Sequence, residues 1–252
     1  MGQRDGLHAG QGPRGRRARE GRGSCAERPS DESDRRTSRA LHRPPLRASS
    51  GLDGKNYRPR MTQKTTVQHT IAPVWNSQSR VLILGTMPSP ASRGAGFFYM
   101  HPQNRFWRAL PAVFGERLEY NNAGKRGADD QAANLAAAID ERKNFLLRHR
   151  IALWDVLLKC EIRGAADASI QNAVPNDFTQ IFEQSQIRRV YCAGKSAFNL
   201  WQKHCAAAYE KRFGLECACL PSASPANAAW SLERLIEAYS VLRQGASPRQ
   251  PL

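Results

Sequence analysis

The residues best suited to chemistry lie in residues 85–107, GTMPSPASRGAGFFYMHPQNRFW. Asn104 carries a donor and an acceptor, which reading the edge of a nucleobase requires. Phe97, Phe98 and Tyr99 stand in a row, and one of these rings can offer a flat face on which a base stacks. The glycines let the backbone approach a ligand closely. This stretch therefore predicts a pocket for a planar, hydrogen-bonding ligand, with a helix cap before residues 106–114 as the alternative role of Asn104.

Two further loops carry small polar residues. Gly194, Lys195 and Ser196 open a helix, and helix N-termini favour anions, so this turn either contacts a phosphate or is an ordinary glycine turn. Residues 220–228, LPSASPANA, are stiffened by two prolines. Such a loop either approaches a phosphate or a groove, or uses Ser224 as the cap of the last helix.

Other polar side chains leave two interpretations open. His101 either donates a hydrogen bond to the ligand or packs as a ring beside Pro102. Asp155 stands at the end of an apolar run, where it either contacts the ligand or caps residues 156–158. Asn176 and Asp177 begin a helix most simply.

The elements that position these residues are predicted from hydrophobic patterns. Short continuous apolar runs are typical of strands covered on both faces, as in a parallel sheet. They occupy residues 81–84, 151–154, 190–193 and 215–220. Helical spacing separates them at residues 106–114, which Pro111 must kink or restart, and at 129–148, 198–208 and 229–242. The sequence therefore predicts a three-layer α/β/α sandwich, whose ligand lies outside the carboxyl ends of the strands.

The charge is strongly positive, at +16 for 252 residues. The first 60 residues contain 15 Lys or Arg and 7 Asp or Glu, hence +8, and lack spaced apolar residues. We interpret residues 1–65 as a disordered basic extension, with Met61 as an alternative start, 66–244 as the folded domain and 245–252 as a tail. The remaining +8 suits a polyanionic partner or reflects an ordinary basic surface. No apolar run approaches the length of a membrane span.

Six cysteines are present, and no pair has the C-x-x-C spacing of a metal site. We interpret them as core thiols in a reducing cytoplasm. We expect neither a metal nor another cofactor.

Together these motifs, G-T-M-P-S, G-F-F-Y-M-H-P-Q-N-R-F-W, C-A-G-K-S-A-F and L-P-S-A-S-P-A-N-A, resemble the uracil-DNA glycosylase superfamily. Its branch of hypoxanthine-DNA (deoxyinosine) glycosylases is the most similar. The segment H-P-x-N-R-F-W is also similar to the mismatch-specific uracil-DNA glycosylases. The likeness covers residues 80–239. It implies a four-stranded parallel sheet between helices, and hydrolysis of the N-glycosidic bond of a deaminated base flipped out of DNA.

The resemblance also implies roles for residues. Asn104 falls on the catalytic Asn of the hypoxanthine branch. Tyr99 falls on the aromatic that the mismatch-specific branch stacks on the extruded base. Residues 220–228 match the segment that enters the duplex beside the flipped nucleotide. The other predicted base-binding residues are Phe98, His101, Thr86, Met87 and Ser222. The predicted DNA contacts are Ser89, Ser92, Lys195, Ser222, Ala223, Ser224 and Asn227.

One departure weakens the enzymatic prediction. Met87 stands where the mismatch-specific branch has a catalytic Asn, and the Asp of the main uracil branch is absent from residues 85–89. Either Asn104 carries the reaction, or the protein is a poor catalyst. Met87 therefore keeps open a second function, a non-catalytic module that binds distorted or mismatched duplex. A third function, a small-nucleotide hydrolase on the same α/β frame, is the weaker alternative, because the sequence contains no metal-binding cluster of carboxylates.

The predicted partner is double-stranded DNA that contains a damaged base. The base is hypoxanthine, with uracil and xanthine as alternatives. No lysine stands out as a Schiff-base nucleophile, so the prediction is base removal without strand cutting. We expect a monomer in the bacterial cytosol and nucleoid.

Overall fold

A computed structural model of the chain describes residues 64–120 and 131–246, without the side chain of Gln131. Its centre is a parallel sheet in which the strand order is β3-β2-β6-β7. These strands span Val81–Gly85 (β2), Ile151–Asp155 (β3), Arg189–Ala193 (β6) and Glu216–Leu220 (β7). All four predicted strands are therefore confirmed to within a residue or two.

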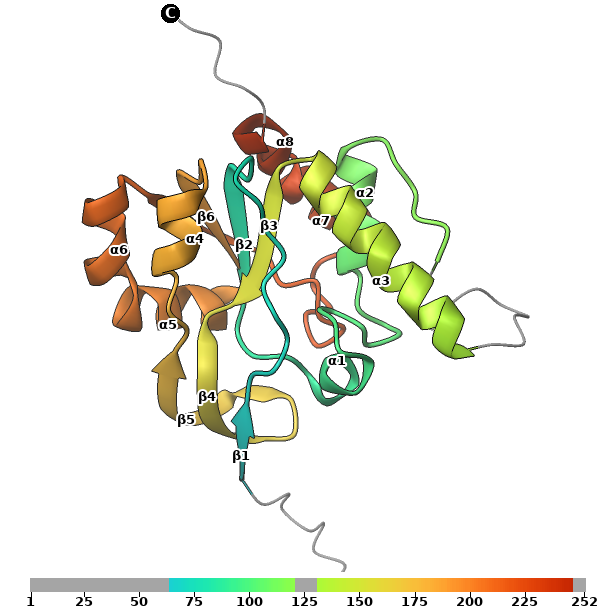
Figure 1. Ribbon diagram of the computed structural model, residues 1–252. Helices are drawn as coiled ribbons and strands as arrows, with labels where there is room; N and C mark the ends of the chain where they lie inside the picture. Colours follow the sequence, from blue (N-terminus) through green and yellow to red (C-terminus); the bar gives the residue numbers. More distant parts are fainter. Residues whose placement is uncertain (1–63, 121–130, 247–252) are drawn as a thin grey trace, which may run out of the picture. The chain divides into compact units, whose positions relative to one another are not determined.

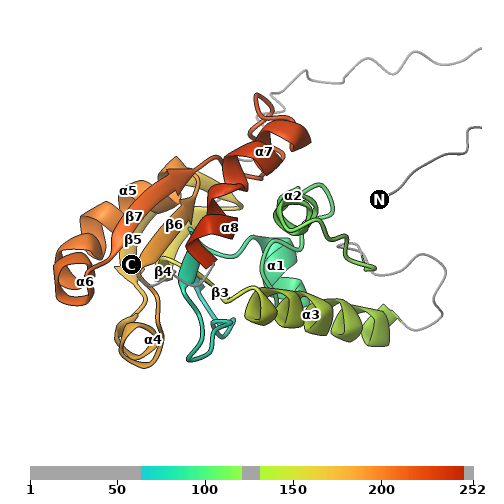
Figure 2. The same ribbon diagram turned by 90° about the horizontal axis from the view of Figure 1, so that it is seen from above.

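Helices cover both faces of this sheet (Figure 1). Along β2, the side chains of Val81 and Ile83 belong to one hydrophobic core, and those of Leu82 and Leu84 to the other. Figure 2 shows the two groups of helices on opposite sides of the strands. The first core is covered by α2 (Phe106–Val113), α3 (Gln131–Arg148), α7 (Leu232–Tyr239) and α8 (Val241–Ala246). The second is covered by α4 (Thr179–Gln184), α5 (Lys195–His204) and α6 (Ala206–Phe213). The predicted three-layer α/β/α sandwich is confirmed.

A second, antiparallel sheet was not predicted. Its strands are β1 (Thr65–Gln68), β4 (Leu157–Arg163) and β5 (Ala166–Pro175), in the order β1-β4-β5. Register shifts interrupt the pairing of β4 with β5, and β5 lacks a regular alternation of buried and exposed residues. Its strand β4 begins two residues after the end of β3. The expected helix at residues 156–158 was therefore wrong, because Val156 and Leu157 donate to the carbonyls of Gly85 and Thr86 instead.

The last predicted helix begins later than expected. The cap of α7 is Ser231, whose Oγ accepts from the backbone N–H of Arg234, so Ser224 as the helix cap was wrong. Residues 221–231 form a long loop instead. Pro111 lies inside α2, where it removes one backbone hydrogen bond, and the helix ends two residues later at Val113. Within residues 64–120 and 131–246, no helix is long and apolar enough to cross a membrane. The predictions for residues 1–63 and 247–252 lie outside the described residues.

Candidate active site

A cavity of about 450 Å³ lies at the carboxyl ends of the parallel strands. Its wall comes from the loop after β2, the end of β3, the β4–β5 hairpin and the loop after β7. This is where a parallel sheet binds its ligands. It contains Asn104 and Tyr99, as the sequence predicts, together with two carboxylates, Asp155 and Asp167.

Tyr99 is held in an unusual position. Its φ angle is 56°, in the left-handed region that non-glycine residues rarely adopt. One face of its ring stacks on Phe106, with the centroids 4.0 Å apart and the planes at 17°. Burial, and then the negative charge of Asp155, raise the pKa of Tyr99 well above its usual value. A neutral, half-buried ring thus lines the cavity, and backbone strain of this kind is typical of functional sites.

Asn104 has a fixed orientation in the cavity wall. Its Oδ1 accepts a hydrogen bond of 2.9 Å from the backbone N–H of Phe106, at the start of α2. The N-cap residue of α2 is Arg105, which has no side-chain cap bond, so the predicted capping by Asn104 was wrong, and its bond to Phe106 forms a local turn before the helix. This bond leaves Nδ2, which has no hydrogen-bond partner within the described residues, as an available donor on a residue that lines the cavity. Holding this turn and contacting a ligand are compatible roles, because they use different atoms of the Asn104 side chain.

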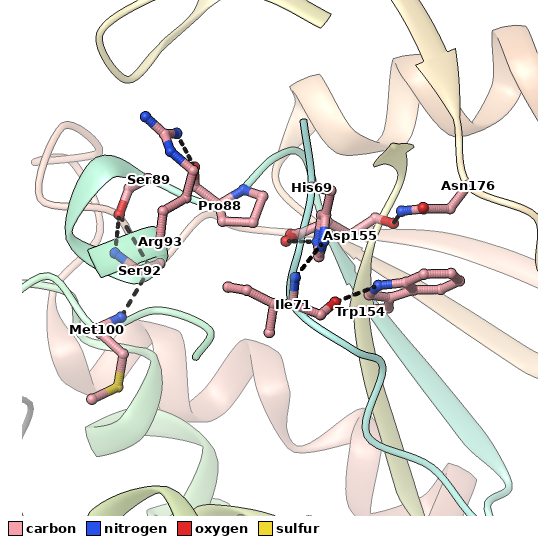
Figure 3. A network of polar contacts seen from close by, with 10 residues as sticks. All are labelled: His69, Ile71, Pro88, Ser89, Ser92, Arg93, Met100, Trp154, Asp155 and Asn176. Atoms are coloured by element: carbon pink, nitrogen blue, oxygen red, sulfur yellow. Dashed lines mark hydrogen bonds and ion pairs between the residues drawn. The ribbon is translucent and has the colours of Figure 1, made fainter. Parts of the chain in front are cut away.

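Asp155 forms a buried pair with His69 (Figure 3). The Nε2 of His69 lies 3.0 Å from Oδ2 of Asp155, while its Nδ1 accepts from the backbone N–H of Ile71 at 3.2 Å. The second contact fixes the tautomer, so Nε2 carries the hydrogen and donates to the carboxylate. Burial raises the pKa of Asp155, and the hydrogen bond from His69 opposes that shift. Capping by Asp155 was wrong, and the open alternative, contact with a ligand, fits its place in the cavity.

A second carboxylate enters from the β4–β5 hairpin. Oδ2 of Asp167 accepts a hydrogen bond of 2.8 Å from Oγ1 of Thr86. Burial, together with the charge of Asp155, raises the pKa of Asp167, and the bond from Thr86 opposes the shift. Thr86 thus lines the cavity as predicted. Its hydroxyl hydrogen, however, is bonded to Asp167, a residue that the sequence analysis did not identify.

The remaining base-binding candidates differ in their placement. Met87 and Phe98 are 9% and 2% exposed and form part of the wall from within the two cores. Ser222 lines the cavity from the other side. His101 is not among the described residues that line the cavity, and its Nδ1 accepts from the backbone N–H of Gln103.

Two predicted DNA contacts are occupied by internal bonds. Ser92 is 2% exposed, and its Oγ accepts from the backbone N–H of Met100 (Figure 3). Ala223 is also 2% exposed, and its carbonyl accepts from the backbone N–H of Arg105. Neither side chain is exposed, so burial gives no support to a direct DNA contact by either, although Ser92 lines the cavity. Ser89 caps α1 (Pro90–Ala95) by accepting from the backbone N–H of Ser92, and it also lines the cavity.

A larger cavity of about 1180 Å³ lies on the other side of the loop after β7. Lys195 is exposed and lines this cavity rather than the smaller one, while Ser222 and Asn227 line both. Among the described residues, no carboxylate or histidine lines the larger cavity. The smaller cavity is therefore the candidate site, since it holds the groups that can bind a polar ring and move charge.

Comparison with known proteins shows the family of the chain. The family model of the uracil DNA glycosylase superfamily matches residues 72–243. The chain belongs to this superfamily. A curated relative from Methanosarcina acetivorans, named hypoxanthine DNA glycosylase, is 30% identical over 68% of this chain and 94% of its own. A second of that name, from Methanosarcina barkeri, is 31% identical over 42% of this chain and 58% of its own.

A solved structure also supports membership of this superfamily. It is a solution NMR structure of a protein from Methanosarcina acetivorans assigned to the uracil DNA glycosylases. Its TM-score is 0.55 at 26% identity, and the match covers 73% of this chain and all of the other. The motifs predicted this fold and this family, and both predictions are confirmed for this uracil DNA glycosylase homologue.

Three residues of this superfamily member were not recognised in its sequence. His69 is separated from Asp155 by 86 residues, and no periodic pattern connects the two. Asp167 follows a short glycine–alanine turn, which gives only a weak hairpin signal. Arg105 stands beside Asn104 within the quoted motif, but its partners lie about 120 residues later. Arg105 lies inside the segment H-P-Q-N-R-F-W that carries the resemblance, and this position was the signal that could have identified it.

Proposed function

We propose that this protein is a DNA-deoxyinosine glycosylase, which hydrolyses the N-glycosidic bond of hypoxanthine flipped out of double-stranded DNA. The observation that carries the proposal is the meeting of Asn104, Tyr99 and Asp155 in one strand-end cavity. The names of the two Methanosarcina relatives support the same substrate. The reaction removes the base and leaves the DNA strand intact.

Asp155 supplies the selectivity in this proposal. Deamination of adenine places a carbonyl at C6 and a hydrogen on N1. An ionised carboxylate accepts from that N–H, whereas adenine presents a lone pair there, which the carboxylate repels. Uracil and xanthine carry the same lactam group, so they remain secondary substrates. His69 holds the carboxylate in place through its hydrogen bond to Oδ2.

Tyr99 and Asn104 act on the extruded base. Tyr99 stacks on it, and Phe106 supports the other face of the tyrosine ring. Cleavage leaves negative charge on the departing base and positive character on the sugar. The Nδ2 of Asn104 donates to that base, and such a preorganised donor is typically worth about 3–4 kcal/mol. The charge of Asp167 stabilises the sugar cation.

This chemistry accounts for methionine at position 87. Asn104 supplies the carboxamide from the next loop, and its Oδ1 is already satisfied by the N–H of Phe106. Met87 then serves as apolar wall, which keeps the cavity dry and strengthens hydrogen bonds inside it. Met87 therefore no longer favours the alternative function, a DNA-binding module without catalytic activity.

A panel of duplexes tests the function. Each duplex carries one deoxyinosine, deoxyuridine, deoxyxanthosine or deoxyadenosine at the same position and is incubated with excess protein, and abasic sites are then cleaved with alkali. We expect the fastest product from deoxyinosine, slower product from the other two lactam bases and none from deoxyadenosine. Binding to all duplexes without any abasic product would instead identify a DNA-binding module, and hydrolysis of free deoxyinosine alone a nucleoside hydrolase.

A further inference from the structure

Arg105 connects the loop that carries Asn104 to a distant loop beyond β7. Its guanidinium donates to the carbonyl oxygens of Ser224 at 2.8 Å and Asn227 at 3.0 Å. It also donates to those of Ala223, at 3.3 Å, and Trp230. The backbone N–H of Arg105 donates to the Ala223 carbonyl as well, at 3.1 Å. Residues 221–230, called the clamped loop below, are therefore tied directly to the neighbour of Asn104.

Further side chains hold the same loop by its carbonyl groups. The hydroxyl of Tyr239 donates to the carbonyl of Pro221 at 2.9 Å, and Nδ2 of Asn227 donates to that of Ser222 at 2.9 Å. Carbonyl oxygens repel phosphates, so drawing them toward internal donors favours the approach of DNA to the other side of the loop. Two prolines add stiffness to the same segment.

The planar guanidinium of Arg105 suits the binding of several carbonyl groups better than the ammonium of a lysine would. The bonds to the four carbonyls use four of its five N–H groups, in directions set by its plane. At most one N–H is left for a phosphate, so direct binding of DNA is a poor explanation for Arg105. Lysine carries the same charge but lacks the planar fork.

We infer that Arg105 is a positioning residue, which holds the clamped loop at a fixed place relative to Asn104 so that base extrusion and base capture are coupled. The inference rests on the proposed function and adds a requirement to it. The clamped loop must fill the space that the base leaves, and the base must arrive at Asn104. A loop that is free to move fails to oppose the return of the base. The need for Arg105 is therefore greatest where a stable base pair must be opened.

The test compares two duplexes of the same sequence. In one, deoxyinosine faces deoxycytidine, and in the other it faces a tetrahydrofuran abasic analogue, so no pair needs to be broken. Single-turnover excision is measured for wild type, Arg105→Gln, Arg105→Lys and the control Arg108→Gln, an exposed arginine on the same helix. We expect the excision rate of both Arg105 variants to fall by about 30-fold when deoxyinosine faces deoxycytidine, and by less than about 5-fold when it faces the analogue. Only the duplex with deoxycytidine requires a base pair to be opened. Arg108→Gln should match wild type on both duplexes.

Three results would overturn the inference. They are equal losses on the two duplexes, full activity of Arg105→Lys, and an equal loss for Arg108→Gln. Tyr239→Phe, which removes one hydrogen bond to the loop but keeps the buried ring, provides a test independent of the folding of the Arg105 variants. Its excision rate should also fall more opposite deoxycytidine than opposite the analogue, by a smaller factor than for the Arg105 variants. An equal fall on the two duplexes would count against the inference. Lack of excision by wild type on both duplexes would reject the proposed function itself.

Discussion

Asp155 experiences opposing influences. Burial disfavours its charge, and the hydrogen bond from His69 favours it, with a net rise in its pKa. A folded protein that binds this proton more tightly than the unfolded chain is stabilised below the unfolded pKa of about 4, and loses that stabilisation as the pH rises through the folded pKa. The proposed mechanism uses the ionised carboxylate, so holding that charge in a buried place costs stability, as is common at functional sites.

Replacing Asp155 with Asn should separate activity from stability. Asn can still accept from His69 but carries no charge, so the melting temperature at pH 7 should exceed that of wild type, with a smaller difference at pH 3. Excision of hypoxanthine should fall by about 100-fold, since the charged acceptor for N1–H is lost. The wild-type rate should fall as the pH drops through the raised pKa of Asp155, and this decline should be absent from the variant. Thermal melts and single-turnover rates measure both effects, with the exposed Asp140→Asn as control. A destabilised but fully active variant contradicts this role.

The ring of Tyr99 should matter more than its hydroxyl. Stacking on a base is worth about 1–3 kcal/mol, so Tyr99→Ala should slow excision by about 10- to 100-fold, and Tyr99→Phe by less than about 5-fold. Both variants keep a residue with a side chain at the φ of 56°, so backbone strain is matched between them. The comparison is made under single-turnover conditions with deoxyinosine duplex. Equal rates for the alanine and phenylalanine variants would exclude stacking on this ring.

The last residue of β2, Gly85, has no room for a side chain. A Cβ atom at this position would lie 2.1 Å from Oδ1 of Asp155 and 2.9 Å from the hydroxyl of Tyr99. Neither partner can move easily, because His69 holds the first and Phe106 supports the second. The close approach of the strand end thus brings the acid and the ring together.

Gly85→Ala should therefore disrupt the site more than the fold. We expect excision to fall by at least about 30-fold, with a loss of unfolding free energy of about 1–3 kcal/mol from overpacking. Gly94→Ala is the matched control, because no heavy atom lies within 4 Å of its Cβ position and it sits in a helix. Chemical denaturation and single-turnover rates give the two quantities. An active Gly85→Ala variant would show that Asp155 and Tyr99 need not keep their present positions.

The sequence allowed prediction of those elements that have a strong local pattern. The parallel strands are continuous apolar runs, and Asn104 and Tyr99 lie in one compact motif. The antiparallel sheet was missed because β5 is half exposed and irregular along its length. The pairs of His69 with Asp155 and of Thr86 with Asp167 join residues 86 and 81 positions apart. Such contacts follow from the chain path, which no local pattern of residues reveals.

The positive charge is divided equally between residues 1–60 and 61–252, at +8 each. Phosphate binding releases counterions, so affinity falls linearly with the logarithm of salt concentration. The catalytic groups proposed above all lie in the second part. The two parts should therefore contribute differently to binding and to cleavage.

A chain shortened to residues 61–252 tests this division. We expect weaker binding to undamaged duplex and a shallower dependence on salt, because fewer phosphates are neutralised. The excision rate at saturating DNA should stay within about 2-fold of the full chain, since the site is unchanged. Fluorescence anisotropy at several salt concentrations gives the slope. A large fall in the saturated rate would mean that the first 60 residues take part in catalysis.

The most direct measurement is the single-turnover excision of hypoxanthine by wild type, Asn104→Ala and the exposed control Asn199→Ala, with duplex saturated by protein. Loss of the Nδ2 donor should slow cleavage by about 100- to 1000-fold while binding of the duplex changes little. Asn199→Ala should cleave at the wild-type rate. Equal rates for wild type and Asn104→Ala would contradict the account, because the carboxamide that stands in for the group absent at position 87 would then have no part in the reaction.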